Sequence, residues 1–291
     1  MDLGYNAAPS SIKYPFGNGI KEIEFRHNFK TMFGFGFAYK WFALRLSAAM
    51  IGNSKPVSRF GEANYVDLDL NFSIKKTYSE INLRTYSGYV IKNAKDWDTS
   101  FNDLKPNDTQ QKINTYNVDF SCWYFDNPNF KMDAFNGKRA HYNKSVTTWY
   151  LDGKIDFYGI TNEKGALIPT QLFDSTNTKT RAQSYNALDI GVIPGIGHVA
   201  KFKDWQFGIM SGLGPRIQFK GYTVDGIPTS LAAIVLRYNV RFIAGYSIPK
   251  FFGVFSLDID NKSIRFDQLN YRLWFYSMRL SVGYRFNKRK K

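Results

Sequence analysis

The sequence predicts an all-β fold, a transmembrane antiparallel up-and-down β-barrel of about twelve strands that forms one domain over residues 1–291. Three observations lead to this prediction. Apolar and polar residues alternate with a period of two along most of the chain, as in strands with one apolar and one polar face. Aromatic residues make up 18% of the chain, a share that suits a protein with two membrane interfaces. Short and long connections alternate between the predicted strands.

The alternation is clearest in residues 65–75. One face of this segment is wholly apolar and consists of Val66, Leu68, Leu70, Phe72 and Ile74. The opposite face is polar and includes Asp67 and Asp69. Similar segments recur, each with about the 9 to 11 residues that a tilted strand needs to cross a bilayer. A transmembrane helix is excluded, because the longest apolar window, residues 41–52, is too short and contains Arg45.

Twelve strands account for the alternating segments. They are predicted at residues 5–15, 30–39, 42–52, 64–75, 78–91, 112–125, 130–160, 185–199, 203–220, 230–247, 251–261 and 271–286. The first is the weakest, because the N-terminal segment 1–22 contains Pro15 and shows little alternation. The seventh is predicted as one long, bulged or bent strand that is interrupted near residues 137–145. Ten or fourteen strands are the alternatives.

The connections between these strands fall into two classes. Short connections are expected at residues 40–41, 75–78, 126–129, 201–204 and 249–250. Longer polar connections are expected at residues 52–63, 92–111, 161–184, 221–229 and 261–270. If both chain ends are periplasmic, as an even number of strands requires, every short connection is periplasmic and every long one is external. This asymmetry is the signature of an outer-membrane barrel, whereas a soluble barrel would point its apolar face inward.

The chain carries 39 Lys plus Arg against 24 Asp plus Glu, a formal net charge of +15. The positive residues are spread over the turns and a basic tail at residues 287–291, so no nucleic-acid surface is expected. Basic rims favour anionic headgroups, and we expect outer-membrane lipid and lipopolysaccharide as partners. Cys122 is the single cysteine, which excludes an internal disulfide. No export signal follows Met1, so for an exported barrel we expect a mature or recloned chain.

The charged residues of the strands are predicted on the face opposite the apolar one, which in a barrel is the lumen. These lumen-lining residues are Asp67, Asp69, Glu80, Arg84, Asp119, Asp152, Lys154, Asp156, Arg237, Arg241, Asp258, Arg279 and Arg285. Charges of both signs there either form a paired network that plugs a narrow barrel or line a selective pore. We expect near-complete pairing, because an unpaired buried charge is costly.

Sequence signals for catalysis are weak. His141 and Ser145 are the candidates for a nucleophilic pair like that of twelve-stranded outer-membrane lipid hydrolases, but a nucleophile needs a base within hydrogen-bond reach. The simpler interpretation of His141 is a wall or loop histidine. The acidic residues lack the spacing of a calcium loop. The glycine-rich stretches 34–37 and 191–197 do not lead from a strand into a helix, as a phosphate loop does. We therefore expect no metal and no cofactor.

Several segments, taken in order, carry a resemblance. They are FGFGFAYKWFALRLS (33–47), YVDLDLNF (65–72), LRTYSGYVI (83–91), FKMDAFNGKRAHYNKSVTTWYLDG (130–153) and SVGYRF (281–286). This order resembles a family of outer-membrane barrels from Bacteroidota-type bacteria that is described as a domain of unknown function. The family opens with a better-formed strand and has small residues after the pair that corresponds to Lys144 and Ser145. The resemblance implies location and architecture, and it implies no known reaction.

The sequence thus predicts an integral outer-membrane protein without enzymatic activity. It would act as a narrow, porin-like channel or as a scaffold subunit in an envelope complex with other outer-membrane or periplasmic proteins. The alternative is an outer-membrane enzyme that acts on lipid or glycan.

Overall fold

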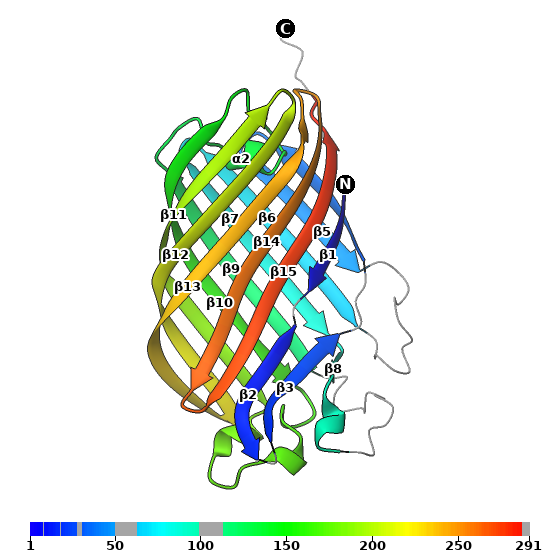
Figure 1. Cartoon of the computed structure of the whole chain (residues 1–291), viewed down its shortest axis with the longest axis vertical. Coiled ribbons are helices and arrows are strands. Elements are labelled where there is room, and N and C mark those ends of the chain that lie inside the picture. Colours follow the sequence, from blue (N-terminus) through cyan, green and yellow to red (C-terminus); the bar gives the residue numbers. More distant parts are fainter. Residues whose placement is uncertain (8, 18, 28–30, 50–62, 99–112, 287–291) are drawn as a thin grey trace.

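The computed structural model describes residues 1–7, 9–17, 19–27, 31–49, 63–98 and 113–286. Within them, fifteen strands form one antiparallel sheet, which closes into a barrel through the pairing of β1 with β15 (Figure 1). The strands are β1 (Asp2–Ala7), β2 (Ser10–Gly17), β3 (Ile20–His27), β4 (Met32–Tyr39), β5 (Phe42–Ala49), β6 (Asn64–Ile74), β7 (Thr77–Ser87), β8 (Tyr89–Ile91), β9 (Ile113–Phe125), β10 (Val146–Asn162), β11 (Ser184–Phe202), β12 (Trp205–Val224), β13 (Ile227–Ser247), β14 (Phe251–Phe266) and β15 (Leu269–Tyr284). The helical elements are η1 (Ala94–Asp96), α2 (Met132–Phe135), η3 (Thr170–Leu172) and η4 (Thr178–Arg181).

The wall of the barrel has twelve strand positions. β1 and β2 pair with β15 in one continuous register, with Leu3 opposite Leu280 and Ile12 opposite Tyr271, so together they occupy one position. β3 and β4 pair with β2 and β1 and occupy the next position. Among the described residues, β8 pairs with β3 alone and lies outside the ring. The prediction of an all-β antiparallel barrel of about twelve strands is confirmed.

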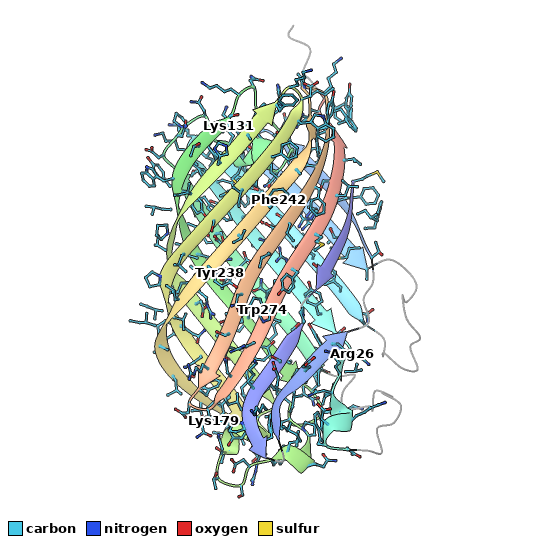
Figure 2. The ribbon with its side chains drawn as sticks, viewed as in Figure 1. Arg26, Lys131, Lys179, Tyr238, Phe242 and Trp274 are labelled. Carbon is cyan, nitrogen blue, oxygen red and sulfur yellow. The ribbon has the colours of Figure 1, made fainter. Side chains whose placement is uncertain are left out.

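Large apolar side chains cover the outside of the wall. In β6 the buried Asp67 and Asp69 alternate with Val66, which is 44% exposed. Many outward side chains are similarly exposed, among them Phe37, Leu46, Val118, Ile155, Ile196, Leu213, Phe255 and Leu280. Water-soluble proteins rarely expose so large an apolar surface, so this belt faces lipid (Figure 2). No helix in the described part of the chain is long and apolar enough to cross a membrane.

Aromatic residues mark both edges of the belt. The edge at the short turns carries Tyr39, Trp41, Tyr124, Trp149, Phe202, Trp205 and Tyr284. Three turn lysines lie over rings of this band, with Lys40 over Tyr39, Lys76 over Tyr124 and Lys203 over Phe202, at 5.3, 5.8 and 5.9 Å. The other edge carries Tyr238 and the stacked pair of Trp274 and Tyr276 (Figure 2). Basic and aromatic rims of this kind are typical of membrane interfaces.

The sequence prediction is wrong for two of the long connections. The expected loop at 221–229 is a tight turn at Asp225 and Gly226, and the one at 261–270 is a tight turn at Asp267. Both segments are strand instead, because β12 to β15 continue beyond the apolar belt, where neither face must be apolar and the alternation is lost. Residues 52–62 and 99–111 of the other expected loops, and the basic tail 287–291, lie outside the described residues.

The prediction for the seventh strand is also wrong. β10 starts only at Val146, and residues 126–145 leave the wall and fold into the mouth of the barrel, where they contain α2. We call residues 126–145 the plug. The apolar residues of the plug pack against the inside of the wall, so this segment has no need for the alternation of a strand. The predicted number of strands in this segment, one, is right, but the residues before Val146 belong to the plug.

The interior of the barrel has three layers. At the short-turn end, the plug forms an apolar cluster with wall residues that include Tyr78, Trp123 and Tyr150. At the long-loop end, a second apolar cluster joins β2, β3, the loop between β10 and β11, and the outer ends of β14 and β15. Charged and polar side chains fill the space between these two clusters.

Candidate functional site

The structure places all thirteen sequence-predicted lumen residues at the interior of the barrel. Twelve project inward from β6, β7, β9, β10, β13, β14 and β15, and Arg285 follows the end of β15. Most are buried, and Asp67, Asp152 and Asp156 have 0% exposure. They do not form one cluster, because the ion pairs divide them into groups that are centred on particular arginines and aspartates.

The first group surrounds Arg45 of β5. Its guanidinium lies 3.1 Å from Asp2, 2.7 Å from Asp67 and 3.3 Å from Asp69, measured between nitrogen and carboxylate oxygen. Arg84 lies 3.5 Å from the second oxygen of Asp67. One buried cation therefore neutralises three carboxylates, one from β1 and two from β6, which ties the first strand into the wall.

The second group surrounds Asp156 of β10. Arg216 pairs with one of its carboxylate oxygens, and Lys262 lies 3.1 Å from the other. Lys154 bridges this group to Asp260 at 3.2 Å. The alternation of acid and base over β10, β12 and β14 leaves each of these buried charges opposite a charge of the other sign, which offsets the cost of desolvation.

A third group lies closer to the long loops and centres on Arg237. Its Nε donates to Asp189 at 2.8 Å, and its terminal nitrogens donate to the Tyr158 hydroxyl at 2.5 Å and to the Ser263 carbonyl at 2.8 Å. Gln218 donates to the same Asp189 at 2.9 Å. Charge and hydrogen-bond capacity are therefore matched here by groups from β10, β11, β12, β13 and β14.

Ion pairs also cross the lumen between nearly opposite walls. Arg241 of β13 pairs with Asp258 beside it and reaches Glu80 of β7 at 3.4 Å. Lys262 of β14 donates to Asn117 of β9. β7 and β13, like β9 and β14, are separated by four strands of the wall. A residual polar cavity of about 60 Å³ beside Arg241 has room for only a few water molecules. Side chains of the described residues therefore bridge the lumen at the level of Arg241 and Lys262.

The plug closes the short-turn end by apolar packing. Phe130 and Phe135 lie 5.9 Å apart between ring centroids, and Met132 is buried with them. Phe135 approaches the wall at Gly208, where an added Cβ would come within 2.7 Å of the Phe135 ring. Gln206 donates to the carbonyl of Ala134 at 3.0 Å. A glycine in β12 is therefore required for the plug to seat.

Arg285, which follows the last strand, binds the plug through hydrogen bonds. Its side chain donates to the plug carbonyls of Gly137 at 2.7 Å, Ala140 at 2.9 Å and Lys138 at 3.1 Å. It also donates to the Ser247 hydroxyl at 2.9 Å. A single guanidinium thus satisfies three carbonyls of a segment that has little regular structure of its own.

The candidate catalytic pair is not assembled. Ser145 accepts a hydrogen bond from the backbone N–H of Lys201 at 2.9 Å, and His141 interacts with Asn143. Among the described residues, no hydrogen bond joins His141 to Ser145. Burial and the nearby cations Arg285 and Lys201 lower the pKa of His141, so it is neutral at pH 7. Both residues belong to the plug at the short-turn end, whereas the lipid hydrolases they resemble use the outer face.

Several site residues were not singled out from the sequence. The predicted lumen residues do not include Arg45, Asp189, Arg216 and Lys262. The inward parity of their strands was the signal that could have found them. Asp2 had no such signal, because its strand shows little alternation. No group of three or more potential metal ligands occurs among the residues that the structure describes.

Comparisons with known proteins bear on family more than on activity. No curated protein matches the sequence. Among solved structures, the toluene transporter TodX of Pseudomonas putida matches with a TM-score of 0.32 and 7% identity, over 99% of this chain and 89% of that chain. The toluene transporter TbuX of Ralstonia pickettii matches with a TM-score of 0.21 and 9% identity, over 98% and 89%. At TM-scores below 0.5 such a likeness supports no conclusion about transport.

A family model gives the firm assignment. It is described as "Domain of unknown function (DUF4421)" and matches residues 6–286, nearly the whole chain. This span contains every strand from β2 to β15 and the plug. The chain belongs to this family, as the resemblance of its segments predicted.

Proposed function

We propose that the protein is a non-enzymatic barrel of the outer membrane that acts as a narrow channel, closed at rest and opened by displacement of the plug. The observation that carries the proposal is the attachment of the plug. Three of its carbonyls accept from one side chain, that of Arg285, and its other contacts with the wall are apolar packing and side-chain hydrogen bonds. A segment held in this way can leave without any break in the pairing of the wall.

The polar interior supports a channel. Buried ion pairs are often no more stabilising than apolar residues of the same size, so stability alone gives little reason for the charges in this lumen. A path for water and small ions does require them, because an apolar interior would exclude both. The cavity beside Arg241 supports the same view, since charged side chains such as Arg84, Asp119 and Lys154 line it.

The outer membrane is proposed from the shape of the wall. A closed barrel satisfies all backbone groups inside a bilayer, and barrels with tight turns at one rim are typical of this membrane. The tight turns at Lys40, Lys75 and Lys203 would then face the periplasm together with the plug. Partners in the periplasm would contact the plug side, and lipopolysaccharide would contact the opposite side.

The experiment is the conductance of the purified protein in planar lipid bilayers. We expect the native chain to be silent or to open rarely, and the Arg285→Ala variant to open often. Arg285 donates to three carbonyls of the plug, and loss of these charge-assisted bonds costs about 3 kcal/mol, or about a hundredfold in the ratio of open to closed plugs. Arg181→Ala, an exposed arginine at the far rim, is the matched control and should stay silent.

A second candidate is a scaffold subunit, which the two sealed ends of the lumen favour. Silence of both the native chain and Arg285→Ala, with the plug shown to be released by its protease sensitivity, would exclude the channel and leave the scaffold. The enzymatic alternative is tested with His141→Ala and Ser145→Ala in lipid-hydrolysis and acyl-transfer assays. Loss of a measured activity in either variant would contradict the non-enzymatic proposal.

A further inference from the structure

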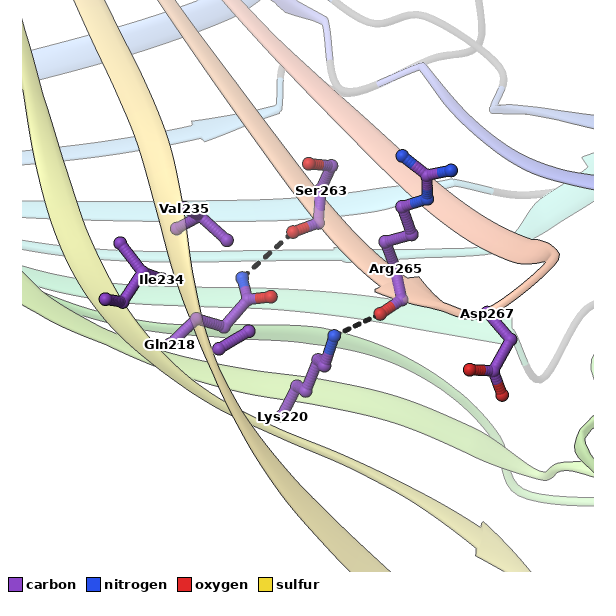
Figure 3. A pocket seen from close by; sticks show the side chains of 8 residues that line it. Gln218, Lys220, Ile234, Val235, Ser263, Arg265 and Asp267 are labelled. Carbon is purple, nitrogen blue, oxygen red and sulfur yellow. Dashed lines mark hydrogen bonds between the residues drawn. The ribbon is translucent and has the colours of Figure 1, made fainter.

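The wall of the barrel separates between β13 and β14 on the long-loop side. Their pairing runs from Ser247 opposite Phe252 to Asn239 opposite Asp260 and then ends. Beyond this point, within the described residues, β13 continues over residues 227–238 paired only with β12, and β14 continues to Phe266 paired only with β15. Figure 3 shows the two strands diverging, with side chains between them. We call this separation the seam.

The edge of β14 at the seam is satisfied by side chains. The carbonyl of Ser263 accepts from Gln218 at 2.9 Å, from Arg237 at 2.8 Å and from the Tyr158 hydroxyl at 3.1 Å. The carbonyl of Arg265 accepts from the Lys220 ammonium group (Figure 3). Buried backbone groups that lack a ladder partner need such substitutes. Four side chains supply these substitute hydrogen bonds, so the separation of the two strands is a stable feature of the wall.

A groove of about 410 Å³ lies in the seam. It is lined by Gln218, Lys220, Ala233, Ile234, Val235, Ser263, Arg265 and Asp267. The groove carries more positive than negative charge, because Lys220 and Arg265 face one acid, Asp267, which Lys179 already neutralises at 2.7 Å. Arg265 is exposed and has no ion pair among the described residues. The positive charge of the groove therefore favours the binding of an anion.

The groove lies at the aromatic edge of the apolar belt on the long-loop side. Tyr238, at that edge, precedes the last paired residue of β13, and the groove begins on the far side of this pair. The outward face of β13 beside the groove is apolar, with Ile234 80% and Leu236 66% exposed. A molecule that fills the groove can thus keep apolar chains against β13 and a charged group at the level of the lipid headgroups.

We propose that the seam binds a phosphorylated glycolipid of the outer leaflet. Its phosphate lies between Lys220 and Arg265, its sugar hydroxyls pair with the free edge of β13 between residues 227 and 238, and its acyl chains extend along Ile234. Charge complementarity favours this occupant, and so does the position at headgroup depth. An acyl chain alone would leave the backbone groups of the β13 edge without partners. The site does not depend on the proposed channel, but it rests on the proposed orientation of the barrel, with the end opposite the plug in the outer leaflet.

The test is native mass spectrometry of the full chain released from nanodiscs of phosphatidylcholine doped with bisphosphorylated lipid A. We expect one lipid A to remain bound to the native chain, and an Arg265→Gln, Lys220→Gln double variant to retain at least tenfold less. Ala233→Trp, which fills the groove and keeps both cations, should lose the lipid as well. Lys203→Gln, at the opposite rim, is the matched control and should retain it. Far-ultraviolet circular dichroism shows that each variant is folded.

Four outcomes would overturn the proposal. Equal retention by the native chain and both folded groove variants would place the lipid elsewhere. Equal retention of dephosphorylated lipid A would exclude recognition of the phosphate. Displacement of the lipid by millimolar glucosamine phosphate would show that the site takes a soluble phosphate. A polypeptide bound in place of the lipid would make the β13 edge a strand-addition site instead.

Discussion

Replacement of Arg45 by methionine tests whether the charged lumen holds the wall together. Arg45 is 4% exposed and lies within 3.3 Å of three buried carboxylates, those of Asp2, Asp67 and Asp69. Methionine removes the cation and leaves these acids in a site of low polarity. Removal of one partner from a buried ion pair costs about 3 to 5 kcal/mol. Arg84 remains 3.5 Å from Asp67, so we expect the lower end, about 3 kcal/mol.

The measurement is reversible urea unfolding of the barrel in phospholipid vesicles, followed by the fluorescence of its 6 Trp residues. Lys13→Met is the matched control, because its pair with Glu22 is 40% and 31% exposed and should contribute about 1 kcal/mol or less. Asp67→Asn in the Arg45→Met background should recover part of the loss. A loss below about 1 kcal/mol for Arg45→Met, or a double variant no more stable than the single one, would refute the idea that Arg45 neutralises this group.

Three further predictions concern the lipid face, the outer loop and the plug. Ile155→Arg, at the middle of the outward face of β10, should lower the free energy of unfolding in vesicles by about 2 to 4 kcal/mol, whereas Ile155→Val should have little effect. The Tyr14 hydroxyl lowers the pKa of Asp174 to about 2, so this contact stabilises the loop between β10 and β11 above pH 4 and is lost as the pH falls toward 2. Hydrogen exchange of this loop should therefore become faster over that pH range. Asp174→Asn should abolish this dependence on pH. Gly208→Val should collide with Phe135, unseat the plug and raise its rate of proteolysis, and unchanged proteolysis would exclude the seating contact.

The strand faces could be predicted from the sequence because lipid and lumen impose opposite demands on alternate residues. Asp67 and Val66 could not exchange faces without exposing a carboxylate to acyl chains. Beyond the membrane, alternate residues no longer face lipid and lumen. This explains why the prediction of a long loop at residues 221–229 is wrong. A local signal existed there: Asp225 and Gly226 have φ values of 51° and 78°, and Asp-Gly between two apolar runs is a strong hairpin signal.

The plug and the seam could not be predicted, for different reasons. Alternation reports which face a side chain takes and carries no information on where pairing stops, so the end of the ladder at Asn239 leaves no trace in the pattern. The plug has apolar residues that a bent strand would also have. Its signal was indirect and lay in the wall: the stretch 191–197 contains Gly197, where an added Cβ would come within 3.1 Å of the ring of Phe130 in the plug.

The pairing of β1 with β15 has a consequence for how the barrel forms. The N–H group of Val282 donates to the carbonyl of Met1 at 2.9 Å, a contact between residues 281 positions apart. Closure of so large a loop is costly in chain entropy, and contacts between distant residues slow folding. Until β15 is in place, the first and last strands present unpaired edges that a bilayer cannot satisfy. We therefore expect closure of this pair to be the last and slowest step of insertion, after β9 to β14 have already assembled through neighbouring hairpins.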